Sequence, residues 1–180
     1  MVLPLLPGPE FTKTITASNG TKITAFQGGW CPLSISNYTP MKISGQRYNS
    51  VLHYILCEKA KYFKDNQSYN AIKSARGASE QAKLGEAIIK GAVSGMPWDE
   101  AELRAMKVAM NEKLAQYPRI YKMLKATGDS ILASCSEYDS YFGTGLDIDS
   151  EDMQNRSKWG KNIIGQTLMD FRLNGYDTFM

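Results

Sequence analysis

Residues 130–145 read SILASCSEYDSYFGTG, a short apolar run followed by acidic, aromatic and glycine residues. The first part, residues 130–135, carries no charge, and its flanks favour turns, which is typical of a short buried strand. The second part, residues 137–145, leaves this strand as a loop, and loops held by a rigid scaffold commonly carry function. The stretch therefore predicts one strand of a small sheet with a candidate site at its end.

Two hairpins are expected earlier in the chain. Residues 12–16 and 21–26 are rich in Thr and Ile and roughly alternate in polarity, with Asn19-Gly20 between them. Asn-Gly is a strong signal for a tight turn, so the two runs predict an N-terminal β-hairpin. A second, shorter hairpin is expected at residues 41–48, around a central Ser-Gly pair.

The rest of the chain is mostly helical in pattern. Ser50 and Pro97 stand where helices favour an N-cap residue and a first-turn proline. Apolar residues at helical spacing predict helices at 50–64, 69–75, 79–92, 97–114, 118–125 and 162–173, with a polar loop at 143–160. We therefore expect an α+β fold, mostly helical, with a small antiparallel sheet and an N-terminal β-hairpin extension.

Composition limits the classes of protein that fit. The chain has 180 residues, of which 43% are hydrophobic and 22% charged, and its net charge is +3. These values indicate a folded protein that does not coat nucleic acid, although its charge permits an anionic small ligand. The single histidine, His53, excludes sites that need two imidazoles, and we expect no metal and no cofactor.

The thiols and the start of the chain bear on the compartment. Three cysteines without a close pair favour free thiols in a reducing compartment. Residues 1–11 hold three prolines, lack a basic leader, and predict an extended arm. No apolar run approaches 18 residues, so we expect a cytoplasmic protein without a membrane partner.

Two loop segments have the residue types that a nucleotide-like ligand needs. In residues 137–145 the aromatic rings can stack on a base, and the glycines let the backbone come close to a ligand. Asp139 can bind ribose hydroxyls or stabilise a cationic sugar. Lys161 and Asn162 stand at the start of the last predicted helix, whose N–H groups and dipole favour a phosphate. A structural turn and an ordinary helix cap are the alternatives.

His53 and Cys57 are the other residues whose side chains could take part in a reaction. His53 is a candidate base, but a lone histidine near the start of an amphipathic helix is more often a hydrogen-bonded structural residue. A Cys57–His53 pair at i,i+4 has no oxyanion-hole sequence beside it, so we favour a buried, unreactive thiol.

Taken in order, several segments resemble the NADAR superfamily (named for NAD and ADP-ribose), also called YbiA-like. The matching segments are Phe26, residues 33–38 (LSISNY), 41–48 (MKISGQRY), His53-Tyr54, 82–85 (AKLG), Trp98 with Met106 and Lys113-Leu114, Thr127-Gly128, 138–145 (YDSYFGTG), 160–165 (GKNIIG) and 168–172 (LMDFR). The resemblance assigns residues 26–175 to the family domain and leaves residues 1–25 as an arm and hairpin.

This resemblance implies an α+β fold with a pocket for a ribosyl phosphate or an ADP-ribose-like ligand. Members of the family cleave N-glycosidic bonds in riboflavin-pathway intermediates or in ADP-ribosylated guanine bases. By position, Ser36, Asn37 and Tyr38 would line the pocket, and Leu52 would stand in it at the place of a family residue. Its second wall would be formed by Asp139, Tyr141, Phe142 and Gly143. Lys161, Asn162 and Arg172 would bind a phosphate or support the pocket.

One position departs from the family pattern. The family's helix start reads Ser-Glu-His-Tyr, with a catalytic glutamate, whereas this chain has Leu52 before His53 and Tyr54. Leucine neither positions water nor stabilises a cationic sugar, and loss of a general base costs about a hundred- to ten-thousand-fold in rate. Glu58 lies six residues further along the same helix, which turns it to nearly the opposite face.

Three functions are consistent with this pattern. The favoured one is a protein that sequesters an ADP-ribose-like or cyclic NAD-derived signal molecule without hydrolysing it, as a viral inhibitor of host defence would. The second is an N-glycosidase that uses Asp139, with or without His53, on an ADP-ribosyl or ribosylamino substrate. The third is an interaction module with a vestigial pocket. A homo-oligomer is a further expectation, because an unmatched hairpin leaves an open edge.

Overall fold

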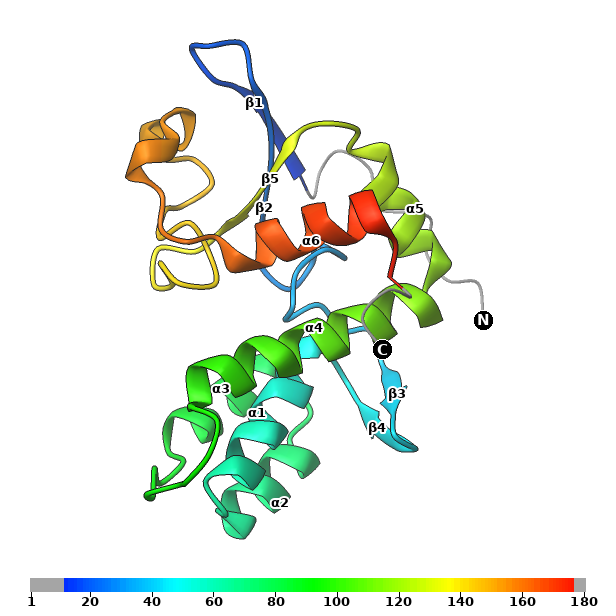
Figure 1. The fold of residues 1–180 in the computed structure, drawn as a ribbon, viewed down its shortest axis with the longest axis vertical. Coiled ribbons are helices and arrows are strands. Elements are labelled where there is room, and N and C mark those ends of the chain that lie inside the picture. The colour runs from blue at the N-terminus through cyan, green and yellow to red at the C-terminus, as the bar shows by residue number, and fades with distance from the viewer. Residues whose placement is uncertain (1–11, 177–180) are drawn as a thin grey trace. The chain divides into compact units, whose positions relative to one another are not determined.

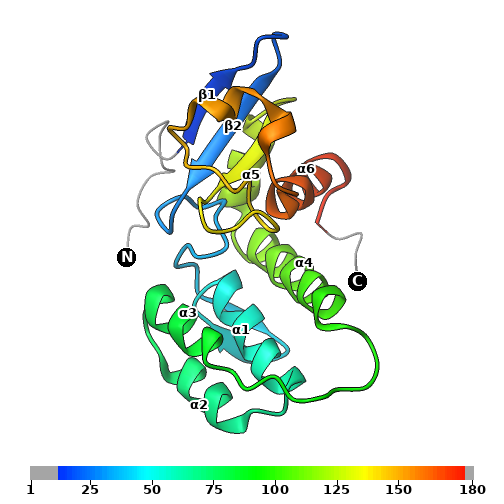
Figure 2. The ribbon, with the colours of Figure 1, turned by 90° about the vertical axis from the view of Figure 1, so that its left-hand side faces the viewer.

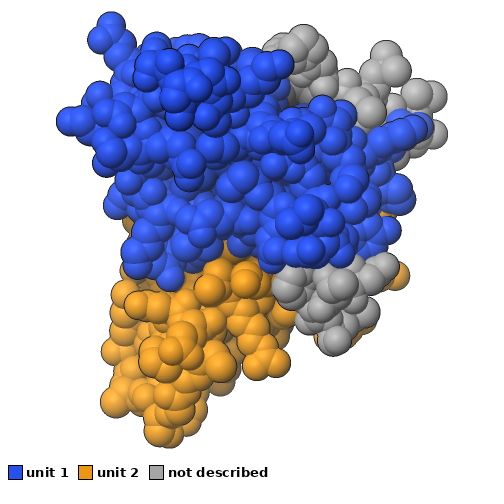
Figure 3. Space-filling model, turned by 45° about the horizontal axis from the view of Figure 1, so that its top comes forward, with its two compact units in different colours: residues 1–37, 117–180 blue, residues 38–116 orange. Residues whose placement is uncertain are grey.

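A computed structural model describes residues 12–176 (Figure 1). Two units divide the chain: residues 1–37 together with residues 117–180 form unit 1, and residues 38–116 form unit 2 (Figure 3). Unit 1 is thus discontinuous in sequence, since the chain leaves it after Asn37 and returns at Tyr117. The predicted arm at residues 1–11 lies outside the described residues.

A three-stranded sheet is the centre of unit 1. Strand β1 (Thr12–Thr16) pairs antiparallel with β2 (Lys22–Gln27), and β2 pairs parallel with β5 (Ile131–Cys135), so the sheet order is β1-β2-β5 (Figure 2). The predicted hairpin and the predicted buried strand are both confirmed. Because β2 is the central strand, the hairpin is part of the sheet. The expected antiparallel sheet is in fact mixed, since β2 pairs parallel with β5.

The segment between β5 and the last helix covers one face of this sheet. It contains two short 3₁₀ turns, η2 (Glu151–Gln154) and η3 (Arg156–Lys158). The apolar side chains that share this core are Ala17, Ile23, Ala25, Ala133, Cys135 and Met153, with Leu146, Ile148 and Trp159 packed against them. The segment predicted as a polar loop therefore supplies part of the core, with a fully buried methionine at its centre.

Helices α5 (Pro118–Ala126) and α6 (Ile163–Asn174) complete unit 1. Helix α6 packs against β5, and the two helices also contact each other (Figure 1). Gly165 permits this approach, because a Cβ at that position would collide with the Leu132 carbonyl oxygen of β5. The glycine thus lets the first turn of α6 lie directly on the strand.

Unit 2 is mainly helical. Its hairpin pairs β3 (Met41–Ile43) with β4 (Gln46–Tyr48). Its helices are α1 (Val51–Tyr62), α2 (Asn66–Ser74), α3 (Ala78–Glu86) and α4 (Trp98–Gln116). Helix α1 packs against the other three, and the Gln116 amide both donates to and accepts from the Lys42 backbone of β3.

Helix α3 ends at Glu86, earlier than the predicted residue 92. Two side chains from neighbouring helices replace the backbone bonds that would extend it. Lys59 donates to the Gly85 carbonyl at 2.8 Å, and the Ile89 N–H donates to the Asp65 carboxylate at 3.3 Å. The apolar pattern beyond Glu86 could not reveal these contacts, which come from segments more than 20 residues away.

The expected fold class is confirmed: the protein is α+β, mostly helical, with small sheets. Ser50 caps α1 as predicted, with its hydroxyl accepting from the His53 N–H at 3.0 Å. Within residues 12–176 no helix combines the length and the apolar character that crossing a membrane requires.

Candidate functional site

The parallel pairing of β2 and β5 brings two loops to one end of the sheet. The ladder between the strands ends at Gln27 and Cys135, so residues 28–37 and residues 136–145 both start at the carboxyl ends of neighbouring strands. In sheets with parallel strands, ligands bind outside these carboxyl ends. This end of unit 1 therefore gathers most of the predicted ligand-binding residues.

The first loop folds back onto the end of β2. The Asn37 side-chain amide donates to the Gly29 carbonyl at 2.8 Å, and the Ser34 and Ser36 hydroxyls hydrogen bond at 3.0 Å. Ser36 and Asn37 are half-buried, and both lie beside Gly29. Tyr38 is 65% exposed and belongs to unit 2, as the first residue after this loop.

Asp139 organises the second loop. Its Oδ1 accepts the N–H groups of Tyr141 and Phe142, at 3.1 and 2.8 Å. Within residues 12–176 no hydrogen bond reaches its Oδ2. The half-buried carboxylate thus has one oxygen committed to the loop and one oxygen available to a ligand.

Gly143 and two aromatic rings form the rest of this loop. A Cβ on Gly143 would lie 2.8 Å from the Ser134 carbonyl and 2.9 Å from the Asp139 carbonyl, so this buried position requires glycine. Tyr141 and Phe142 are half-buried and pack edge to face with ring centroids 5.0 Å apart. The Lys161 ammonium lies 4.7 Å from the centre of the Tyr141 ring, which brings a positive charge to the same loop.

Carbonyl groups of this loop accept hydrogen bonds from the first N–H groups of α6. The N–H groups of Ile163 and Ile164 donate to the Tyr141 and Phe142 carbonyls, at 3.3 and 3.0 Å. The sequence favoured a phosphate here because the first N–H groups of a helix usually lack partners. In this protein these two are already bonded, so Lys161 is the predicted phosphate contact that stays exposed at this helix end.

Asn162 bonds to β5 through both ends of its side-chain amide. Its Nδ2 donates to the Leu132 carbonyl at 2.8 Å, and its Oδ1 accepts the Ser134 N–H at 3.0 Å. The Thr144 N–H donates to the Ser134 carbonyl, so the outer edge of β5 is paired without another strand. Asn162 is thereby a buried scaffold residue, and its contact with a ligand stays a prediction.

Arg172 lies at the other end of α6. Ten residues separate it from Asn162, which is about 15 Å along a helix. Its guanidinium donates to the Thr127 hydroxyl at 2.7 Å, and burial lowers its pKa. Arg172 and Lys161 therefore do not share one phosphate, and Arg172 supports the contact between α5 and α6.

Leu52 and His53 stand in the first turn of α1, in unit 2. Leu52 is half-buried, whereas the His53 side chain is buried and its Nδ1 accepts the Asn49 N–H at 3.0 Å. Burial and the charge of Lys73 lower the pKa of His53 below its usual value of 6.5, while the Ile72 carbonyl acts in the opposite direction. The ring is therefore neutral near pH 7 and enclosed, a geometry that favours its structural role.

The cysteines do not form a reactive centre. Cys31, Cys57 and Cys135 are buried and form no disulfide with one another, and burial raises the pKa of both Cys57 and Cys135 to about 11. A thiol with such a pKa is a poor nucleophile at neutral pH. Among residues 12–176 there is also no group of three or more His, Cys, Asp and Glu side chains arranged to hold a metal ion.

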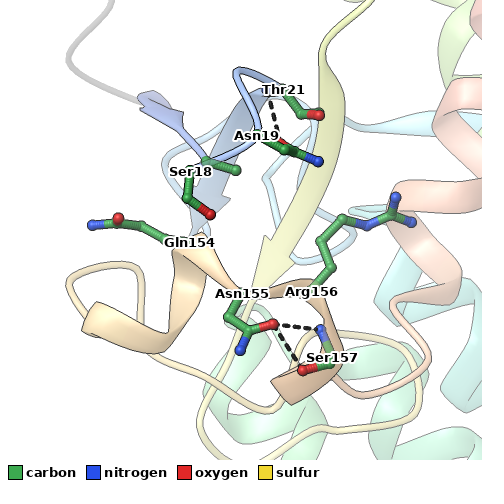
Figure 4. A pocket seen from close by; sticks show the side chains of 8 residues that line it. Ser18, Asn19, Thr21, Gln154, Asn155, Arg156 and Ser157 are labelled. Atoms are coloured by element: carbon green, nitrogen blue, oxygen red, sulfur yellow. Dashed lines mark hydrogen bonds between the residues drawn. The ribbon is translucent and has the colours of Figure 1, made fainter.

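A polar hollow of about 420 Å³ lies elsewhere in unit 1 (Figure 4). The turn between β1 and β2 forms one wall, and the η2–η3 segment forms the other. Its lining residues are Ala17, Ser18, Asn19, Thr21, Gln154, Asn155, Arg156 and Ser157. None of the predicted site residues belongs to this set, so it is separate from the end of the sheet at Asp139.

Sequence reasoning missed one residue at the candidate site. Trp30 follows β2 within the first loop and is 83% exposed. Its signal was available as Gly28-Gly29-Trp30 directly after a predicted strand, because loops that leave a rigid scaffold commonly carry function.

Comparison with known proteins places this chain in a family. Its residues 17–174 match the model of the NADAR domain. An N-glycosidase from Nostoc punctiforme (Npun_R5314) is 29% identical over 146 residues, which cover 79% of this chain and 86% of the relative. A chloroplastic riboflavin biosynthesis protein PYRR from Zea mays is 26% identical over 185 residues, covering 94% of this chain and 28% of that much longer protein.

The fold has a counterpart among solved structures. The NMR structure of the E. coli protein YbiA matches with a TM-score of 0.65 and 22% identity, over 83% of this chain and 82% of YbiA. This likeness supports the α+β architecture described above. With a domain model matched over most of its length and this shared fold, the chain belongs to the NADAR domain family.

Proposed function

We propose that this protein acts on the N-glycosidic bond of a ribosylated compound, as an N-glycosidase of low turnover. The observation that carries the proposal is the Asp139 carboxylate, held at the end of a parallel strand pair in a NADAR domain with Oδ2 open to a ligand. The similarity to the Nostoc N-glycosidase supports the same reaction class.

The reaction needs a group that tolerates positive charge on the sugar. Water attacks the anomeric carbon, the carbon–nitrogen bond breaks, and the nitrogen leaves with a proton. The transition state resembles an oxocarbenium ion, which a nearby carboxylate stabilises. In this proposal Oδ2 of Asp139 faces the sugar, Ser36 and Asn37 contact its hydroxyls, and Lys161 contacts a phosphate.

Leu52 is the reason to expect low turnover. The family pattern has glutamate at this position, and a leucine provides neither a base nor a negative charge. His53 does not replace it, because the ring is enclosed and its Nδ1 already accepts a backbone hydrogen bond. The leucine in place of the family's glutamate also favours a second candidate function, in which the protein holds an ADP-ribose-like or cyclic NAD-derived molecule without cleaving it.

One incubation separates the two candidates. The pure protein is mixed with ADP-ribose, cyclic ADP-ribose isomers, an ADP-ribosylated oligonucleotide or a ribosylamino compound, then denatured, and the released molecules are identified by mass spectrometry. A freed base or amine supports the N-glycosidase. Release of an intact, tightly held ligand supports sequestration, and recovery of neither contradicts both.

Leu52→Glu tests the role of the missing acid. If the scaffold is otherwise competent, the glutamate raises turnover by about a hundredfold or more, the size of a general-base effect. Leu52→Gln is the matched control, because glutamine has nearly the same shape as glutamate but carries no charge. Equal, unmeasurable turnover of both variants, with unchanged ligand affinity, contradicts the idea that Leu52 limits the reaction.

Asp139→Asn tests the carboxylate separately. An asparagine oxygen can still accept the N–H groups of Tyr141 and Phe142, so the loop keeps its shape while the negative charge is lost. We expect residual turnover to fall by about a hundredfold or more, with little change in thermal stability. Turnover equal to that of the unmodified protein removes Asp139 from the reaction.

A further inference from the structure

The polar hollow between the β1–β2 turn and the η2–η3 segment has no part in the proposed reaction. Its hairpin wall precedes Lys22 at the start of β2, whereas the Asp139 loop lies beyond the other end of that strand, after Gln27. A strand of this length spans about 20 Å. None of the lining residues belongs to the segments on which the family resemblance rests.

Both walls of the hollow are attached to the core of unit 1. Ala17, on the hairpin side, is buried in the same apolar cluster as Met153, which directly precedes Gln154 of the opposite wall. Lys13 of β1 donates to Asp149 Oδ1 at 2.8 Å and so ties the hairpin to the segment before η2. The shape of the hollow therefore follows from packed segments on both sides.

Two asparagines, one in each wall, keep a free hydrogen-bond donor. Asn19 Oδ1 accepts the Thr21 N–H at 3.0 Å (Figure 4). In the same way, Asn155 Oδ1 accepts the Ser157 N–H at 3.1 Å. Because backbone N–H groups only donate, these bonds fix the oxygen of each amide and leave its Nδ2 as the other end. Within residues 12–176 neither Nδ2 has a hydrogen-bond partner.

Arg156 adds one positive charge to the hollow. Its guanidinium carbon lies 5.9 Å from the centre of the Trp159 ring, and in the described part of the chain no carboxylate forms an ion pair with it. The lining residues include neither Asp nor Glu. Free donors with one cation and no anion suit a group that accepts hydrogen bonds and carries negative charge, which is an oxyanion.

The volume of the hollow and the charges around it limit the ligand further. The hollow of about 420 Å³ has the room of roughly fourteen water molecules, more than an inorganic phosphate ion fills. Outside the lining, Asp149, Glu151 and Asp152 are exposed on the adjoining chain and repel additional negative charge. These features favour a small, neutral, polar body with one anionic group over a long polyanion such as a nucleic acid.

We propose that this hollow binds a polyhydroxylated compound with a single oxyanion group, such as a monosaccharide phosphate or a sugar acid. Arg156 and the free amides of Asn19 and Asn155 bind the anionic group, and the hydroxyls of Ser18 and Thr21 meet the hydroxylated body. The inference goes beyond the proposed function and does not depend on it, since none of these residues takes part in that reaction.

Calorimetry with matched ligands and variants tests the proposal. The probes are glucose 6-phosphate, gluconate, glucose and inorganic phosphate, which separate the two kinds of anion from each other and from the hydroxylated body. Arg156→Gln removes the charge. Asn19→Asp keeps an oxygen for the Thr21 N–H and a favourable turn sequence, but replaces the free donor by a negative oxygen. Lys158→Gln is the control, because it removes a neighbouring exposed charge that does not line the hollow.

We expect glucose 6-phosphate or gluconate to bind more tightly than both glucose and inorganic phosphate, and the tighter of the two identifies the anionic group. Arg156→Gln and Asn19→Asp each weaken that binding about 10- to 100-fold, the usual effect of losing a charge-assisted hydrogen bond. Lys158→Gln changes it less than about twofold. Absence of binding by every probe overturns the proposal, as does binding that Arg156→Gln leaves unchanged or that a short DNA duplex displaces.

NMR of the side-chain amides locates the bound probe. On addition of the tighter-binding anion, the Nδ2 signals of Asn19 and Asn155 shift, while that of Asn162, which is bonded to β5, stays in place. A shift at Asn162 without shifts at the other two assigns the probe to the start of α6 and contradicts a site in the hollow. The measurement needs no turnover, so failure of the proposed reaction leaves its result intact.

Discussion

Asn162 pairs with β5 as the backbone of a neighbouring strand would. Its backbone has a φ of 51°, a left-handed conformation that asparagine tolerates better than most residues. This conformation turns the side chain so that both ends of the amide meet Leu132 and Ser134. A single residue thus joins the start of α6 to the edge of the sheet.

Asn162→Leu is expected to lower the free energy of unfolding by about 2–5 kcal/mol, because two backbone groups of β5 lose their partners and leucine disfavours a positive φ. Urea denaturation followed by circular dichroism measures this loss. Asn155→Leu is the control, since Asn155 caps an exposed 3₁₀ turn and contributes about 1 kcal/mol or less. Equal losses in the two variants contradict the role assigned to Asn162.

For single residues, the sequence predicted the position of Asp139 but not the bonds that Asn162 makes to β5. The position of Asp139 follows from local order alone, because it comes directly after a recognisable strand. The bonds of Asn162 depend on partners 28 and 30 residues away. No local pattern encodes that register, so the sequence could place Asn162 at the start of a helix but could not show its bonds to β5.

Among the elements, two long connecting segments differ in how they are held. Residues 87–97 follow α3 and are mostly exposed, with three glycines or prolines among them. Residues 145–160, predicted as a polar loop, bury Met153, and Gln27 binds them through Asp147 and the Ile148 N–H. The difference arises because the second segment packs on the sheet and the first does not.

Limited trypsin digestion distinguishes these segments. We expect cleavage of the native protein after Lys90 and protection of Arg156 and Lys158, although all three side chains are exposed. Cleavage requires about ten residues of local unfolding, which is easier where few tertiary contacts hold the backbone. Mass spectrometry of the first fragments identifies the site.

Gln27→Ala is the matched variant for this digestion. It removes the two hydrogen bonds that tie residues 147–148 to β2, so cleavage at Arg156 and Lys158 accelerates while cleavage after Lys90 stays unchanged. Initial cleavage of the unmodified protein at Arg156 shows instead that residues 145–160 are not held by the sheet.

The elements themselves were largely predictable, and their assembly was not. Both hairpins, β5 and the helices were expected from polarity patterns and cap residues, since these signals are local. The parallel pairing of β2 with β5 joins residues more than 100 apart, and the 3₁₀ turns capped by Ser150 and Asn155 were read as loop. The candidate site depends on that pairing, which explains why Trp30 was missed.

At the scale of the whole molecule, the pH dependence of stability has one dominant source near neutrality. His53 is the only histidine of the chain, and its pKa is lowered in the folded state, chiefly by burial. The unfolded chain therefore binds a proton more readily than the folded one. Stability from this group is fully present above the unfolded pKa of about 6.5 and is lost as the pH falls below it.

We expect the melting temperature to be level from pH 8 to 7 and to fall between pH 6.5 and 5. The slope from one proton is at most about 1.4 kcal/mol per pH unit. The pKa values of Asp65 and Asp147 are lowered by backbone hydrogen bonds, so the stability that depends on their charge is lost only below about pH 4. Above pH 5, the change in melting temperature therefore reports on His53 and not on these carboxylates.

His53→Gln removes the titrating ring and keeps an acceptor for the Asn49 N–H. Thermal melts at half-unit intervals between pH 5 and 8 compare it with the unmodified protein. The variant is less stable throughout, because it fills the buried site less well, but its melting temperature stays level down to pH 5. Parallel curves for the two proteins would assign the acid sensitivity to other groups and show that His53 takes up its proton in the folded state as easily as in the unfolded chain.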